Sequence, residues 1–250
     1  MDFTLKIYRD LLTALKSADY AFLTFEQFCE GKRAAKFVIL RHDVDLKAEN
    51  SLATAKIENE LGITASYFFR VVPQSNKPQI IRQIAALGHE IGYHYEDLSL
   101  FKGDKEQAIA HFEKQLAHFR QFYPVRTICM HGSPTSKFDN RSIWKSYNYR
   151  DFGIIGEPYF DVNFNDIFYL TDTGRRWDGE RFSVRDKVKS DFNLHFKTTQ
   201  QIINALKNNE LPPKIMITTH PQRWTDSRFD WTEELILQTV KNAIKRLIIR

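Results

Sequence analysis

The chain has 250 residues, of which 42% are hydrophobic and 27% charged, and its formal net charge is +5. This composition is ordinary for a globular protein and excludes a disordered tail, a collagen or a small disulfide-stapled domain. No stretch approaches about 18 consecutive apolar residues, which excludes a membrane span, and the start MDFTLKIYRD lacks the apolar core of a secretory signal. The basic residues form no dense run, so nucleic acid is not an expected partner. Two distant cysteines favour reduced thiols in a cytoplasmic protein.

Helical and strand patterns alternate along the chain. Apolar spacing predicts helices over residues 5–15, 47–61, 78–87, 104–120, 139–147, 198–208 and 231–248. Apolar runs predict strands at KFVILRHDVD, ITASYFFRVV, HEIGYHY, VRTICM, FGIIG, IFYLTD and KIMITTH. This alternation predicts a parallel sheet with crossover helices, either open or closed into a barrel.

No repeat or linker interrupts the sequence, so one domain is expected over residues 1–250. It would comprise an N-terminal helical extension over 1–36, a core over 37–224 and a closing helix within 225–250. The closing helix is amphipathic and is expected to cover the barrel, with a place on a membrane surface as the lesser alternative.

Carboxylate and imidazole side chains stand where the predicted strands end. In a parallel sheet or barrel, these carboxyl ends meet at one face. Residues far apart in sequence are therefore expected to converge there: Asp43, Asp45, His94, Glu96, His131 and His220.

Asp43 and Asp45 are two apart on a strand and would face the same side, as a metal ligand and a general base. The alternative is that Asp45 caps the following helix. His94 beside a carboxylate suits zinc or a similar divalent ion. His131 could be a ligand, a substrate donor or a turn cap. His220, fixed by the next proline, could transfer a proton.

Arginines and aromatic side chains flank these strand ends and could bind a sugar, whose C–H faces suit aromatic rings. The residues expected to contact substrate are Asp172, Arg176, Trp177, Arg223 and Trp224. Asp172, at another strand end, could instead orient a catalytic partner. A core position is the alternative for such aromatic residues.

The ordered set RHDVD, GHEIGYH, HGSP and a final THP, spanning about residues 37–224, resembles the polysaccharide deacetylase family. This family is also called the NodB-homology domain or carbohydrate esterase family 4, and the resemblance is to a WbmS-like branch associated with surface-polysaccharide gene clusters. The resemblance implies a distorted (β/α) barrel with about seven parallel strands. It also implies metal-dependent removal of N-acetyl groups from sugars.

The family's residue roles fall on four positions of this chain. Asp43 matches the catalytic base, His220 the general acid, Asp45 the metal-binding aspartate, and His94 the first histidine of the His-x-x-x-His metal motif. The second histidine of that motif would fall on Leu98, which cannot bind a metal. His131 is the leading substitute ligand, and Glu96 and Asp97 are the alternatives.

The resemblance thus implies a zinc-dependent or similarly metal-dependent N-deacetylase of surface-polysaccharide or lipopolysaccharide biosynthesis. A cytoplasmic enzyme would act on a nucleotide-linked or lipid-linked acetylated sugar. Two alternatives remain open: a non-catalytic sugar-binding relative, and a metal hydrolase that cleaves another non-peptide C–N bond.

Overall fold

The computed structural model describes residues 1–133, 135–178 and 188–248, without the side chains of 244–248. Its strands form one sheet in which every pairing is parallel, in the order β5-β4-β3-β2-β7-β6 with β1 also beside β2. The strands are β1 (Ala21–Leu23), β2 (Phe37–Val44), β3 (Ser66–Phe69), β4 (Glu90–Tyr95), β5 (Ile128–Met130), β6 (Phe168–Thr171) and β7 (Lys214–Thr219). Within the described ranges no pairing joins β5 to β6, so the sheet is a curled half-barrel. The predicted α/β fold with seven parallel strands is confirmed.

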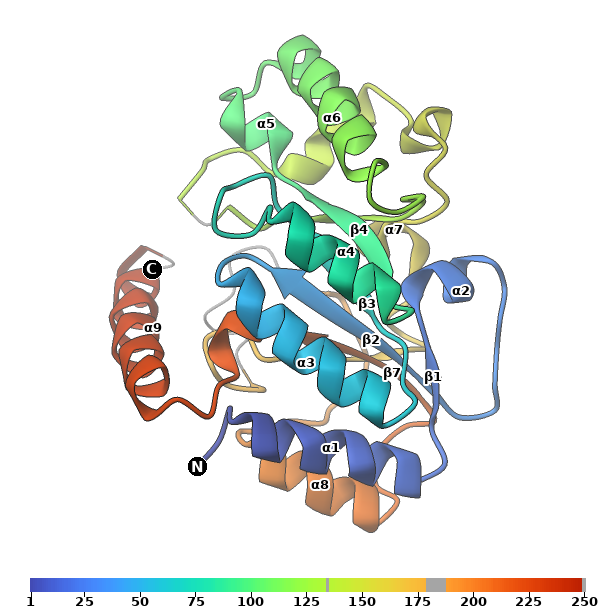
Figure 1. The fold of residues 1–250 in the computed structure, drawn as a ribbon, viewed down its shortest axis with the longest axis vertical. Coiled ribbons are helices and arrows are strands. Elements are labelled where there is room, and N and C mark those ends of the chain that lie inside the picture. Colours follow the sequence, from blue (N-terminus) through green and yellow to red (C-terminus); the bar gives the residue numbers. More distant parts are fainter. Residues whose placement is uncertain (134, 179–187, 249–250) are drawn as a thin grey trace.

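Helices follow most strands and pack against the sheet, with α3 and α4 lying across it side by side in Figure 1 and α1 beside α8 at one end. The α-helices are α1 (Leu5–Ser17), α2 (Phe25–Cys29), α3 (Ala48–Glu60), α4 (Pro78–Ala86), α5 (Asp97–Leu100), α6 (Lys105–Phe119), α7 (Pro158–Asp161), α8 (Thr199–Lys207) and α9 (Arg228–Ile248). Short 3₁₀ helices are η1 (Asn140–Lys145), η2 (Tyr149–Phe152) and η4 (Pro221–Arg223). The predicted helices are present, with ends shifted by a few residues.

The sheet differs from the sequence prediction at two places. The strand β1 was not predicted, because three residues are too few to show a period; it pairs with the first half of β2, and β3 pairs with the second half. The predicted strand FGIIG is wrong. Its first residue ends η2, and only Gly156 makes a bridge, to Thr127. The N-terminal segment therefore supplies part of the sheet.

The long helix α9 lies along one side of the molecule (Figure 1), and several of its apolar side chains are exposed. Phe229 is 79% exposed, Ile236 59% and Val240 53%. Its inner side is attached by hydrogen bonds such as that from Asn242 to the carbonyl of Gly174. Leu235, Ile236 and Val240, which were expected to face the barrel, are therefore exposed instead.

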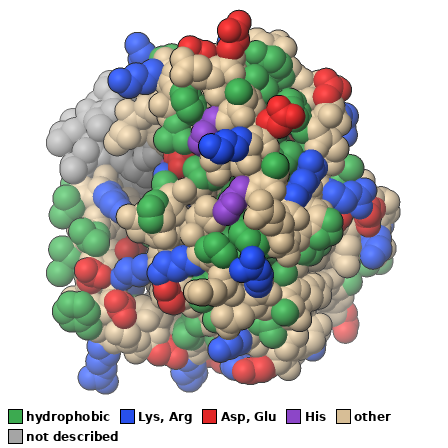
Figure 2. Space-filling model, turned by 45° about the horizontal axis from the view of Figure 1, so that its top comes forward, with side chains coloured by type: hydrophobic (Ala, Val, Ile, Leu, Met, Phe, Trp, Pro, Cys, Tyr) green, Lys and Arg blue, Asp and Glu red, His purple; other side chains and the backbone are tan. Residues whose placement is uncertain are grey.

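None of the helices in the described ranges has the length and apolar character needed to cross a membrane. On the face shown in Figure 2, basic side chains are interspersed with acidic, hydrophobic and uncharged ones.

Gly92, in the middle of β4, lies directly under the ring of Phe68. A Cβ at this position would come within 2.3 Å of the ring and 3.1 Å of the Thr127 carbonyl oxygen. We expect Gly92→Ala to lower the free energy of unfolding by about 1–3 kcal/mol, as overpacking in a core does. Denaturant unfolding measures this. In a double-mutant cycle, Phe68→Leu should reduce the cost of Gly92→Ala; strict additivity would contradict the contact.

Candidate metal and catalytic site

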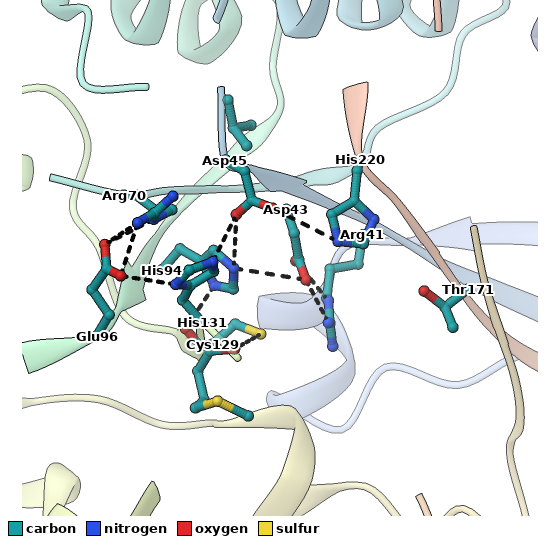
Figure 3. Close-up of polar contacts among 12 residues, drawn as sticks. Arg41, Asp43, Asp45, Arg70, His94, Glu96, Cys129, His131, Thr171 and His220 are labelled. Carbon is teal, nitrogen blue, oxygen red and sulfur yellow. Dashed lines mark hydrogen bonds and ion pairs between the residues drawn. The ribbon is translucent and has the colours of Figure 1, made fainter. Parts of the chain in front are cut away.

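The carboxyl ends of four strands bring together the side chains that the sequence singled out (Figure 3). Asp43 is on β2, and Asp45 follows directly after it; His94 is on β4, His131 follows β5 and His220 follows β7. Asp45 lies at the centre, within 4.0 Å of a ring nitrogen of each of the three histidines. The convergence predicted from parallel strand ends is therefore present in the structure.

Asp43 is held by an arginine from its own strand. Arg41 and Asp43 are two apart on β2, so both face the site, and the guanidinium binds both carboxylate oxygens, at 2.9 and 2.7 Å. Burial alone would raise the pKa of Asp43, but Arg41 and the nearby His94 and His220 hold it below its ordinary value. The carboxylate is thus ionised and fixed in orientation at neutral pH.

Asp45 does not cap the helix that follows it, because α3 begins only after Lys47. Its Oδ1 atom is buried and has no hydrogen-bond partner among the residues that the structure describes. This atom lies 3.6 Å from Nε2 of His94 and 3.5 Å from Nε2 of His131. Burial opposes ionisation, yet His131, His220 and His94 lower the pKa of Asp45. Binding a cation would compensate the burial of this carboxylate oxygen.

His94 presents one nitrogen to Asp45 because the other is occupied. Its Nδ1 lies 2.9 Å from the carbonyl oxygen of Cys129 on the neighbouring strand β5. A carbonyl can only accept, so Nδ1 carries the proton and Nε2 presents its lone pair. Burial lowers the pKa of His94, although Asp43 and Asp45 oppose this effect. The neutral imidazole is the form that binds a metal.

His131 is held in the same way by a carboxylate. Its Nδ1 lies 2.8 Å from Oε2 of Glu96, and Arg70 binds both oxygens of Glu96, each at 2.8 Å. Burial would raise the pKa of Glu96, but hydrogen bonding from His131 and the charge of Arg70 lower it to about 2. Glu96 therefore orients His131, as carboxylates commonly do for metal-binding histidines, rather than serving as the ligand itself.

His220 is positioned by Asp172, which follows β6. The Nδ1 atom lies 2.6 Å from Oδ1 of Asp172, and Nε2 lies 4.0 Å from Oδ2 of Asp45. Burial and Arg223 lower the pKa of His220, but Asp172 outweighs them and the net shift is upward. Asp172 also accepts from Arg223 and from the indole of Trp224. His220 can thus carry a proton near neutral pH and present it from Nε2.

Two of the three separations in the set Asp45, His94 and His131 suit a divalent ion. Ligands about 2.1 Å from a tetrahedral ion are about 3.4 Å apart, close to the two separations around Asp45. One carboxylate and two imidazoles, with ring orientation fixed by Cys129 and Glu96, suit zinc. A second set shares His94: one donor atom each from Asp43, His94 and Cys129 lie within 4.8 Å of one another. Arg41 already binds both oxygens of Asp43, which favours the set built on Asp45.

The other side of β2 is closed off from the site. His42 points away from Asp43 and contacts Thr219 at 2.6 Å and Glu58 of α3 at 2.7 Å. Tyr67 donates to the second oxygen of Glu58 at 2.7 Å. This buried polar cluster fixes α3 against the sheet and does not take part in the site.

The substrate-contact predictions need correction. Trp224 is fully buried, packing on Phe3, and Trp177 is 4% exposed and donates to Thr199. Both rings belong to the core, which was the alternative, although Trp177 also lines a pocket beside Arg176. Arg223 and Asp172 are engaged with His220 and serve to position it.

Arg176 is more exposed than the other predicted substrate contacts. Its guanidinium binds the carboxylate of Asp178 at 2.7 and 2.9 Å. Asp97, an alternative ligand, points elsewhere: its carboxylate accepts from Tyr93 and contacts His111. Leu98 is buried and packs in the core. Neither position contributes a ligand.

Three residues of the site were missed from the sequence. Arg41 could have been found, because it stands two residues before Asp43 in RHDVD and must face the same side. Arg70 follows β3, but no nearby polar residue marked it. Cys129 lies inside an apolar strand, where a cysteine is usually only a small buried side chain.

No family model matches the chain, and no curated protein matches it. Among solved structures it is similar to a CE4 family pseudoenzyme from Bacillus anthracis, with 14% identity over 86% of this chain and 63% of that chain and a TM-score of 0.46. It is also similar to a Streptococcus mutans CE4 esterase (14% identity, 92% and 90% coverage, TM-score 0.44). A Streptomyces lividans family 4 carbohydrate esterase in complex with acetate gives 14% identity, 85% and 88% coverage and a TM-score of 0.42.

The chain spans less than two thirds of the length of the Bacillus anthracis protein. At these identities and TM-scores, we base the function on the side chains described above.

Proposed function

We propose that this protein is a metal-dependent carbohydrate N-deacetylase, with Asp45, His94 and His131 holding a divalent ion, Asp43 as general base and His220 as general acid. The observation that carries the proposal is the buried Oδ1 of Asp45, which has no hydrogen-bond donor in the described part of the chain and lies near two imidazole nitrogens. Each imidazole is fixed by a partner on its other nitrogen. Zinc is the metal that this donor set fits best.

The reaction is hydrolysis of an N-acetyl amide. When bound, a divalent ion polarises the acyl carbonyl and acidifies a water molecule. Asp43 accepts a proton from the attacking water, and Arg41 keeps its carboxylate ionised and oriented. The C–N bond breaks as His220 donates a proton to the amine nitrogen, and Asp172 stabilises the imidazolium beforehand. Water is consumed, and the products are acetate and the free amino sugar.

The experiment compares zinc content and acetate release in the wild type, His131→Ala and Cys129→Ser. We expect one zinc per chain and acetate release from N-acetylated sugars in the wild type. Loss of tight zinc binding is expected in His131→Ala, since removing one of three protein ligands opens the site. Cys129→Ser is the matched control and should retain zinc.

Zinc loss in Cys129→Ser but not in His131→Ala would contradict this ligand set in favour of the one with Cys129. A wild-type chain that binds an N-acetylated sugar but neither holds zinc nor releases acetate would show a non-catalytic sugar-binding protein. Full activity after metal removal would overturn metal dependence.

A further inference from the structure

A pocket of about 410 Å³ opens beside the site and is lined in part by His131. Its wall includes the proposed metal ligand His131 and Glu96, which orients it, so the pocket adjoins the proposed metal site. The size is in the range of small-molecule binding sites. A sugar whose acetamido group reached the metal ligands would therefore have room for a substituent in this pocket.

The charge of the pocket is positive. Three basic side chains line it, Arg70, Lys102 and Lys137, against a single acid, Glu96. Arg70 binds Glu96 through both of its oxygens, so these two charges offset each other. Within the described part of the chain, neither Lys102 nor Lys137 has a carboxylate oxygen within 4.0 Å. Two lysine charges are therefore left without an acidic partner.

The remaining polar wall suits a phosphate. Hydroxyl-bearing residues also line the pocket, among them Ser99 of α5 and Thr135 of the loop after β5. Hydroxyl groups can donate to phosphate oxygens, and lysine ammonium groups bind phosphate as point charges. The aromatic ring of Phe138, which lies 5.2 Å from the ammonium of Lys137, gives this wall an apolar part.

We propose that this pocket binds a phosphate group on the substrate, so that the enzyme acts on a phosphorylated or phosphate-linked N-acetyl sugar. The proposal rests on the proposed function for the placement of the sugar. It adds a substrate class, because Lys102 and Lys137 would recognise the phosphate itself. A nucleoside diphosphate and a polyprenyl diphosphate share this chemistry.

Binding is measured by calorimetry with the zinc-loaded Asp43→Asn chain, which prevents turnover. The ligands are an N-acetylhexosamine, its 1-phosphate, the same sugar on a nucleoside diphosphate, and the same sugar on a short water-soluble prenyl diphosphate. We expect at least one phosphate-bearing ligand to bind about tenfold or more tightly than the neutral sugar, with a preference that weakens at high salt. The better of the two diphosphate ligands identifies the carrier.

The variant Lys102→Gln/Lys137→Gln should lose most of this preference. The matched control Lys56→Gln/Lys207→Gln removes the same charge from exposed positions on α3 and α8 and should keep it. Equal or undetectable affinity for all ligands, or an equal loss in both double variants, would overturn the proposal. Acetate release from the neutral sugar is followed separately with the wild type, so failure of the phosphate pocket is distinguishable from failure of the deacetylase.

Discussion

Asp43→Asn should lower kcat by about 10²–10⁴-fold, the usual contribution of a general base, while zinc stays bound. The amide cannot accept the proton that Asp43 takes from the attacking water. The proposed ligands Asp45, His94 and His131 are untouched, so metal content separates this variant from a ligand variant. The measurement is steady-state acetate release, together with zinc per chain on the same sample.

The same substitution leaves Arg41 buried without its charge partner. Removing one member of a buried ion pair costs about 3–5 kcal/mol, so a lower free energy of unfolding is also expected. Asp97→Asn is the matched control, because Asp97 is a buried carboxylate with Tyr93 and His111 as its partners. It should lose stability but keep its kcat within about threefold. Normal turnover in Asp43→Asn would remove Asp43 from the mechanism.

The strand ends were the predictable part of this molecule. A continuous apolar run that ends in charge, repeated along the chain, fixes both the parallel sheet and the edge where polar groups collect. Asp43, Asp45, His94, His131 and His220 follow from that rule alone. The period of a strand also determines that His42 faces away from Asp43, and the structure places it on Glu58.

The partners of these residues could not be predicted in the same way. Glu96 was a candidate ligand because it alternates in phase with His94, but its carboxylate binds Arg70, which follows β3, and His131. The sequence does not distinguish a tryptophan that lines a sugar site from one that fills the core, and this holds for Trp177 and Trp224. Their burial depends on Phe3 and Thr199, which lie far away in sequence. The position of each of these side chains depends on contacts with residues from other parts of the chain.

Asp172→Asn should move the alkaline limb of the pH profile of kcat/KM to lower pH. Burial and Arg223 lower the pKa of His220, and Asp172 is the group that brings the net shift above the ordinary value. His220 must be protonated to donate to the leaving amine, so activity is lost as pH rises through its pKa. Removing the negative charge of Asp172 lowers that pKa, and the loss then begins at lower pH.

The pH profile separates this positioning role from a merely structural one. His220→Gln should show no such limb and should be slower by about 10²–10⁴-fold, because a general acid is missing. The matched control is Asp178→Asn, which removes a carboxylate that pairs with Arg176 outside the site and should leave the limb in place. An Asp172→Asn enzyme with reduced kcat/KM and an unchanged alkaline limb would mean that Asp172 only supports the fold. An alkaline limb that persists in His220→Gln would mean that His220 is not the group whose protonation the reaction requires.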